Sequence, residues 1–133
     1  MPKLNPIGIV IASVAFYLVG FLWYGVLFTD AWMAAEGLTP ADAEEQNPVY
    51  MLGGLLITVM QVIGLAIVLK WKGVSGIGDA LKSTALLWAL FALPFSMYAY
   101  LYLPRHDSTL LMIDASHLLV GWLIAAAIVT RFK

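Results

Sequence analysis

Asp114 and His117 are the residues whose types and spacing most directly indicate chemistry. They are three positions apart, so on an α-helix both side chains point the same way. A carboxylate beside an imidazole that titrates near neutral pH can relay protons or contact a ligand. The alternative is structural: an Asp–His hydrogen bond, shared with Tyr98, Tyr17 or Ser96, that fixes the helix among its neighbours. The candidate proton or ligand site comprises Asp114, His117, Gln61 and Tyr98.

A metal site is the sharper alternative, because two histidines and two aspartates lie near one another in the sequence: His106, Asp107, Asp114 and His117. Nitrogen and carboxylate ligands suit zinc or a related divalent ion. Their spacing matches no stringent metal motif, however, and His106 with Asp107 is most simply interpreted as a solvated turn. Gln61, about halfway along its helix, is better suited to hydrogen bonding between helices than to ligand binding. We expect no cofactor.

Four apolar stretches dominate the 133 residues, of which 62% are hydrophobic and 11% charged. The predicted helices cover residues 6–28, 48–69, 80–103 and 109–130. Each reaches the roughly 20 residues that a helix needs to cross hydrocarbon. The sequence therefore predicts an all-α membrane protein, a single domain over residues 1–133 that forms an up-down bundle of four transmembrane helices. The absence of cysteine excludes disulfides, thiolate metal sites and cysteine nucleophiles.

The basic residues predict the orientation of this bundle. If the helices alternate in direction, six of the seven Lys and Arg residues fall on one side: Lys3, Lys70, Lys72, Lys82, Arg131 and Lys133. Only Arg105 falls on the other side. Because cytoplasmic loops are enriched in Lys and Arg, we expect both termini in the cytoplasm. The first stretch is too long and too aromatic at its end for a cleaved signal peptide, so we expect it to be retained.

Local signals predict where the helices begin. Asn5 and Asn47 each precede a proline, an arrangement that caps a helix start. Asp79 and Ser108 are the expected caps of the third and fourth helices. We therefore expect side-chain oxygens at the start of each span.

The outer connection, residues 29–47, contains signals for two short helices. Asp30 is expected to cap a helix over residues 31–36 that stops at Gly37. Residues 39–47 are expected to form the second. A tryptophan on the first piece favours a position at the membrane interface.

Small and polar residues mark the inward faces of three helices, because lipid supplies no hydrophobic drive for helix association. These residues are Gly8, Ala12, Ala15, Val19 and Trp23 in the first helix, Gly54, Thr58, Gln61 and Leu65 in the second, and Asp114, His117, Gly121 and Ala125 in the fourth. The third helix instead carries an aromatic ladder of Thr84, Trp88, Phe91, Phe95, Tyr98 and Tyr102. Such a stripe is more typical of packing than of a cofactor site. Pro94 is expected to kink this helix.

Two runs of residues resemble a known family. They are Gly20-x-x-Trp23-Tyr24-Gly25-x-Leu27-Phe28-x-x-x-Trp32 and, after three spans, Ile113-Asp114-Ala115-x-His117-Leu118-x-x-Gly121. The pattern resembles domain-of-unknown-function family 1761, a group of short bacterial membrane proteins with four helices. The resemblance implies a bacterial cytoplasmic (inner) membrane, a compact fold and a helix-packing motif of Gly20, Trp23, Tyr24, Trp32 and Gly121. It implies no activity and no role for Asp114 or His117.

Three classes of function remain open on the sequence. The first is a carrier or channel for a small solute, ion or proton that acts as a homo-oligomer, since four helices enclose little room. The second is a non-catalytic subunit that binds lipid, a partner or a larger membrane complex through its aromatic residues. An enzyme is disfavoured, because Ser116 and His117 are neighbours and point about 100° apart on a helix. No feature indicates binding to nucleic acid.

Overall fold

The computed structural model describes residues 3–39, 48–102, 104 and 106–132, and this part of the chain is almost entirely helical. In chain order the elements are α1 (Pro6–Leu22), the π-helical segment η1 (Trp23–Leu27), α2 (Thr29–Glu36), α4 (Pro48–Lys72), α5 (Ile77–Leu87), the π-helical segment η2 (Trp88–Ala92), α6 (Leu93–Tyr102) and α7 (Ser108–Arg131). Helix α1 continues into η1, and α5, η2 and α6 form one continuous helix.

Four helices in the described ranges are long and apolar enough to cross a membrane: Pro6–Leu27, Pro48–Lys72, Ile77–Tyr102 and Ser108–Arg131. At 1.5 Å per residue each spans about 33 to 39 Å, more than the roughly 30 Å of hydrocarbon in a bilayer. Large apolar side chains face outward; Leu52 and Met112, for example, are 67% and 70% exposed. Water would drive such surfaces to aggregate, whereas lipid tails cover them readily. The predicted all-α membrane fold is confirmed.

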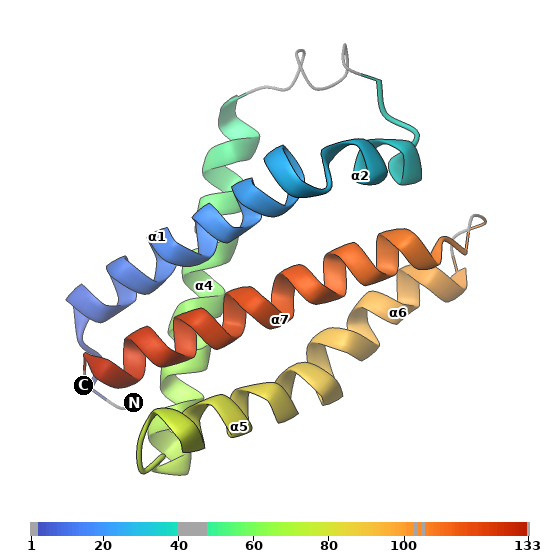
Figure 1. Cartoon of the computed structure of the whole chain (residues 1–133). Helices are drawn as coiled ribbons and strands as arrows, with labels where there is room; N and C mark the ends of the chain where they lie inside the picture. Colours follow the sequence, from blue (N-terminus) through green and yellow to red (C-terminus); the bar gives the residue numbers. More distant parts are fainter. Residues whose placement is uncertain (1–2, 40–47, 103, 105, 133) are drawn as a thin grey trace.

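Helix α7 is central and contacts α1, α2, α4, α5 and α6. Figure 1 shows α1 on one side of α7 and α5 with α6 on the other, while α4 crosses behind them at a steep angle. The ends of the chain and the turn between α4 and α5 lie together at one end of the bundle. We call it the basic end, since the basic residues that the structure describes belong to these segments: Lys3, Lys70, Lys72, Lys82 and Arg131. The opposite end, near α2, is the α2 end.

The close approach of α1 and α7 depends on small residues. The Phe16 ring, only 2% exposed, packs over Gly121, and a Cβ atom added at Gly121 would overlap the ring. Ala12 on α1 and Ala125 on α7 are buried in the same core, and Val62 of α4 completes it. The middle of the bundle, around Phe16 and Gly121, is therefore closely packed.

The start of α1 agrees with the sequence, and the start of α7 differs by one residue. Asn5 caps α1, as predicted, by accepting a hydrogen bond from the Ile7 N–H at 3.0 Å. The predicted Ser108 cap of α7 is wrong, because Asp107 accepts from the Thr109 N–H at 2.9 Å and caps the helix instead. A carboxylate is favoured there because its charge complements the positive end of the helix dipole.

The predicted Asp79 cap of the third span is also wrong. Helix α5 begins at Ile77 after Gly76, so Asp79 lies inside its first turn. Its carboxylate accepts from the Ser75 N–H at 3.0 Å and pairs with the Lys72 ammonium at 3.1 Å. Asp79 thus closes the turn between α4 and α5, which lets the helix begin earlier than the sequence pattern indicates.

Helix α2 follows the first span almost without a break. The Phe28 N–H donates to the Trp23 carbonyl at 2.9 Å, a wide turn that carries the chain directly into α2. Asp30 is therefore not its cap and lies in its first turn. Gly37, with φ of 73°, ends α2 as predicted, because glycine adopts this left-handed conformation readily. The predicted second short helix, with the Asn47 cap, lies outside the described residues.

The aromatic ladder divides into two parts, so its interpretation as a packing stripe is only partly correct. Thr84 is fully buried, but the last four members, Phe91, Phe95, Tyr98 and Tyr102, are 56%, 69%, 59% and 79% exposed. The reason is η2, because a π-helical turn holds one extra residue and rotates all later side chains by about 100°. The Leu93 N–H reaches back to the Trp88 carbonyl, and this wide turn directly precedes Pro94. The third span bends between α5 and α6 (Figure 1), as the proline predicted.

Gly121→Ala tests the α1–α7 contact. The added methyl group must displace the Phe16 ring, so we expect the free energy of unfolding in detergent to fall by about 1 to 3 kcal/mol. Gly64→Ala is the matched control, because a Cβ atom at this helical position in α4 meets nothing within 4 Å. The control should be neutral or stabilising by up to about 1 kcal/mol. Equal stability of the two variants would contradict the packing described.

Candidate functional site

A hydrogen bond between Tyr24 and Asp114 is the centre of the candidate site. The Tyr24 hydroxyl donates to Asp114 Oδ1 at 2.5 Å. Tyr24 lies in η1 and Asp114 in the second turn of α7, so the bond joins the first and last spans near the α2 end. Both side chains are only partly buried. The carboxylate thus has one fixed partner and further acceptor positions available.

His117 lies one turn along α7 from Asp114, but the two side chains do not form the predicted hydrogen bond. The His117 ring packs against Phe16 and Tyr24, with ring centroids 5.5 and 5.1 Å apart. Its Nε2 atom is buried and has no hydrogen-bond partner. Burying such a group unpaired costs about 1 to 3 kcal/mol. An unpaired nitrogen in this position is a plausible contact for a proton, water or ligand.

Gly20 is what makes room for the His117 ring. A Cβ atom at Gly20 would lie 3.1 Å from His117 Nε2, which is tighter than ordinary van der Waals contact. The small residue that the family pattern contains therefore borders the unpaired nitrogen directly. Gly20 has a role at the site in addition to helix packing.

Two indole N–H groups hold the neighbouring turn of α7 in place. Trp23 Nε1 donates to Ser116 Oγ at 3.0 Å, and Ser116 Oγ in turn donates to the Ile113 carbonyl at 3.0 Å. From the other side, Trp88 Nε1 donates to the Ala115 carbonyl at 2.9 Å. Because these bonds come from the first and third spans, they fix the rotation of α7. Asp114 and His117 are thereby oriented toward α1.

Gln61 connects α4 to this arrangement. Its Oε1 atom accepts from Trp122 Nε1 of α7 at 2.9 Å. The Tyr17 hydroxyl of α1 donates to the Met51 carbonyl of α4 at 3.1 Å. These bonds hold α4 against α1 and α7 at two levels. Gln61 therefore acts between helices, as its sequence position indicated.

Two cavities meet at Asp114. The first, which we call the groove, lies between α1, α4 and α7, has a volume of about 570 Å³ and includes Tyr24, Gln61, Asp114 and His117 in its lining. The second, the α2-end pocket, has a volume of about 370 Å³. Its lining includes Glu36, Tyr100, His106, Asp107 and Asp114. Asp114 is therefore part of the lining of both cavities, whereas His117 lines only the groove.

The other predicted site residues lie apart from this centre. Tyr98 is 59% exposed and stacks on Tyr102, with ring centroids 6.2 Å apart, so it does not contribute to the groove. His106 Nδ1 lies 2.7 Å from the Tyr100 carbonyl, and Asp107 caps α7. Within the described ranges, no three His, Asp or Glu side chains come close enough to hold a metal ion. The four metal candidates are thus divided between the two cavities.

Tyr24 is the site residue that sequence reasoning assigned only to packing. A signal was present, because Tyr24 lies near the end of the first span and Asp114 near the start of the fourth. If these spans are antiparallel neighbours, the two residues lie at similar depth. Comparing the depths of polar residues in the membrane would have paired Tyr24 with Asp114. The sequence does not show, however, which faces of the two helices contact each other. Trp32, the other aromatic of the family pattern, packs edge-on against Tyr24 with ring centroids 5.3 Å apart.

The fold and site define a multi-pass α-helical membrane protein whose polar residues gather around one intramembrane carboxylate. The chain belongs to the family described as "Protein of unknown function (DUF1761)", whose model matches residues 7–130. This confirms the resemblance seen in the sequence. Comparisons with curated proteins and with solved structures find no match.

Tyr24→Phe tests the central hydrogen bond. The variant leaves Asp114 without its partner, so we expect the free energy of unfolding in detergent to fall by about 1 to 3 kcal/mol. Tyr98→Phe loses the same hydroxyl from an exposed side chain and should change stability by less than about 0.5 kcal/mol. If both variants unfold alike, the bond does not contribute to the fold.

Proposed function

We propose that this protein is a small carrier or channel for protons or small cations, with Tyr24, Asp114 and His117 as its binding site. One observation carries the proposal: Asp114 lines both the α2-end pocket and the groove. Ionisable groups within membrane helices are rare and usually mark proton or substrate pathways. A carboxylate that borders two cavities has the position expected of such a pathway.

The lining of the cavities favours cations over anions. Glu36, Asp107 and Asp114 place three carboxylates around the α2-end pocket, with His106 beside them. The groove is lined by aromatic rings, including Tyr17 and Trp32. Aromatic faces attract cations by about 0.5 to 2 kcal/mol each. A proton or a small organic cation is therefore the solute class that fits best.

Within the described part of one chain, a packed core separates the groove from the basic end. Below His117 the space is filled by Phe16 against Gly121 and by the core around Ala12 and Ala125. A pathway must then form by movement of helices or at contacts between subunits. We accordingly include a homo-oligomer in the proposal.

The direction of access follows from the distribution of charge. All basic residues that the structure describes belong to segments at the basic end, and Lys and Arg are enriched on the cytoplasmic side of membrane proteins. We place the protein in the bacterial inner membrane with both termini in the cytoplasm. The α2-end pocket then opens to the periplasm.

An accessory role in a larger membrane complex is the second candidate. It is favoured by the exposed part of the aromatic ladder, where Phe91, Phe95, Tyr98 and Tyr102 form a continuous face on η2 and α6. Aromatic residues are frequent at the centres of protein interfaces. This role needs neither cavity, so the Asp114 experiment below separates the two candidates.

Single cysteines test the proposed orientation, because the native chain contains none. We expect Leu38→Cys, just beyond α2, to react with a membrane-impermeant maleimide added to intact cells. Lys72→Cys, at the end of α4, should react only after the membrane is permeabilised. The reverse labelling pattern would place the termini outside the cytoplasm and overturn the orientation.

Asp114→Asn tests the proposed binding site. The amide oxygen can still accept from Tyr24, so the variant removes the negative charge while retaining the hydrogen bond. With tetraphenylphosphonium as the probe cation, we expect binding to purified protein to weaken about tenfold or more, equivalent to about 1.4 kcal/mol. Wild-type binding should also weaken as the pH falls, because protonation of the Asp114 carboxylate removes its negative charge. This pH dependence should be reduced in the variant.

His117→Phe and Tyr98→Phe complete the comparison. The first removes the unpaired nitrogen from the groove and should impair proton uptake in vesicles, while the second, outside both cavities, should behave as wild type. Binding and uptake that are unchanged in Asp114→Asn and His117→Phe would refute the carrier. If binding and uptake are unchanged and the protein also co-purifies with a larger membrane complex, the accessory role is supported.

A further inference from the structure

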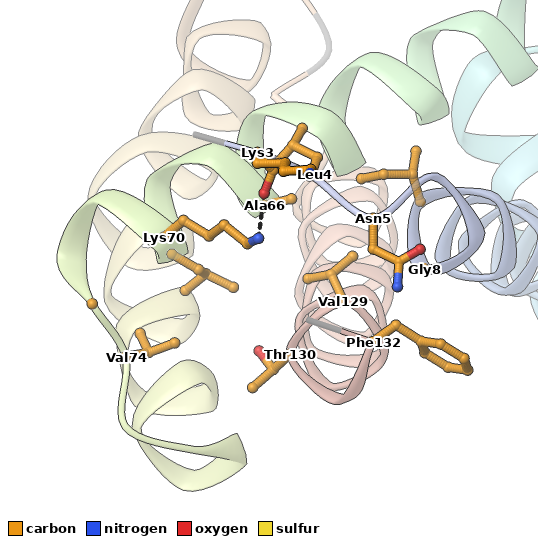
Figure 2. A pocket seen from close by; sticks show the side chains of 13 residues that line it. Lys3, Leu4, Asn5, Gly8, Ala66, Lys70, Val74, Val129, Thr130 and Phe132 are labelled. Carbon is orange, nitrogen blue, oxygen red and sulfur yellow. Dashed lines mark hydrogen bonds between the residues drawn. The ribbon is translucent and has the colours of Figure 1, made fainter. Parts of the chain in front are cut away.

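A third cavity lies at the basic end, remote from Asp114. It has a volume of about 440 Å³ and lies between the start of α1, the end of α4 and the end of α7. Figure 2 shows Lys3 and Asn5 reaching it from the chain start, Lys70 from α4, and Thr130 from α7. We call it the basic-end pocket. Its position at the helix ends corresponds to the headgroup level of a bilayer.

The described lining of the pocket carries positive charge. Lys3 and Lys70 belong to this lining, and among the residues that the structure describes no Asp or Glu does. The ion pair found among the described residues uses a different lysine, Lys72, with Asp79. The Lys70 ammonium donates to the Lys3 carbonyl, which holds it at the pocket (Figure 2). An ammonium has three N–H donors, so others remain for a ligand.

The helix ends around the pocket do not cancel this charge. The start of α1 contributes about half a positive charge, while the ends of α4 and α7 contribute about half a negative charge each. The two lysines carry full charges, so the pocket stays positive by more than one unit on this simple sum. An anion is therefore the ligand that its electrostatics favour.

Thr130 supplies an independent observation. The residue is 8% exposed and lines the basic-end pocket, and its buried Oγ1 atom has no hydrogen-bond partner among the described residues. Burying an unpaired hydroxyl is unfavourable unless something accepts or donates a hydrogen bond. A phosphate oxygen among the lysines would accept from it.

The apolar residues of the pocket lining indicate that the bound anion carries apolar groups. Leu4, Ile9, Leu69 and Val74 give it apolar sides beside the two lysines. A phosphodiester with a glycerol backbone and acyl chains would place its charge at the lysines and its carbon atoms against these walls. The orientation proposed above also puts this end at the cytoplasmic leaflet, where anionic lipids attract basic residues.

We propose that the basic-end pocket binds the phosphate group of an anionic phospholipid through Lys3, Lys70 and Thr130. Lys70 and Lys3 neutralise the phosphate, and the Thr130 hydroxyl donates to one of its oxygens. Because the α1 start, the α4 end and the α7 end all border this pocket, the bound lipid joins three of the four spans. This proposal does not depend on cation transport at Asp114.

Native mass spectrometry of the full chain in detergent tests the site, with phosphatidylglycerol as the probe and phosphatidylcholine as the neutral-headgroup comparison. Lys70→Gln removes the charge but retains N–H donors for the Lys3 carbonyl. We expect its affinity for phosphatidylglycerol to fall about fivefold or more, the effect typical of one basic residue near an anionic surface. Lys72→Gln is the matched control, two residues away and outside the pocket lining, and should bind nearly as wild type.

Thr130→Val adds a variant that preserves every charge and nearly the same shape. Weaker binding in this variant supports the site, because long-range attraction cannot explain it. Inorganic phosphate that competes at millimolar concentration, with the same dependence on Lys70, would support phosphate recognition at this site. Competition by phosphate together with no preference for phosphatidylglycerol over phosphatidylcholine would overturn the lipid as its source. Equal losses in Lys70→Gln and Lys72→Gln, or unchanged binding in both Lys70→Gln and Thr130→Val, would overturn the proposal.

Discussion

The Phe16 ring packs over Gly121 at the centre of the bundle, where any side chain on α7 would collide with it. Lipid tails compete for apolar surface as well as any helix does, so association in a membrane depends on such close fits and on hydrogen bonds between helices. The contact sets the separation of α1 from α7. That separation brings Tyr24 within hydrogen-bonding distance of Asp114 and the His117 ring against Gly20.

The two halves of the molecule, on either side of the Phe16–Gly121 contact, are packed by different kinds of residue. Toward the basic end, alanines and Val62 fill the space between helices. Toward the α2 end, aromatic side chains lie between the helices instead. Their N–H and O–H groups form hydrogen bonds between helices, and cavities remain between these helices. The first half contributes the apolar core of the bundle, and the second contributes polar groups that line cavities. The wide turn η1 contributes directly, because Tyr24 belongs to it.

The sequence was sufficient to predict the four membrane spans, because each span is a long apolar run that hydropathy alone identifies. It identified Asp114 and His117 because ionisable residues are conspicuous in such runs. It could not identify Tyr24 as the partner of Asp114, since one sequence does not reveal which helix faces meet. The sequence also did not predict that Tyr98 faces outward. The π-helical segment η2 changes the direction of all later side chains, and no residue type indicates a π-helical turn. The helix starts differ for a related reason, since several nearby oxygens compete for the same free N–H groups.

The indole bonds to α7 have a consequence for how the groove could open. Trp23 and Trp88 donate hydrogen bonds to adjacent residues of α7 from opposite sides. Rotation of α7 about its axis would therefore break both bonds. Sliding α1 is equally constrained by the ring seated over Gly121. Helix α4 is joined to the same two helices by the Gln61 and Tyr17 hydrogen bonds and by Val62 in the shared core. The face of α7 that carries Asp114 and His117 is thus held in one orientation relative to α1.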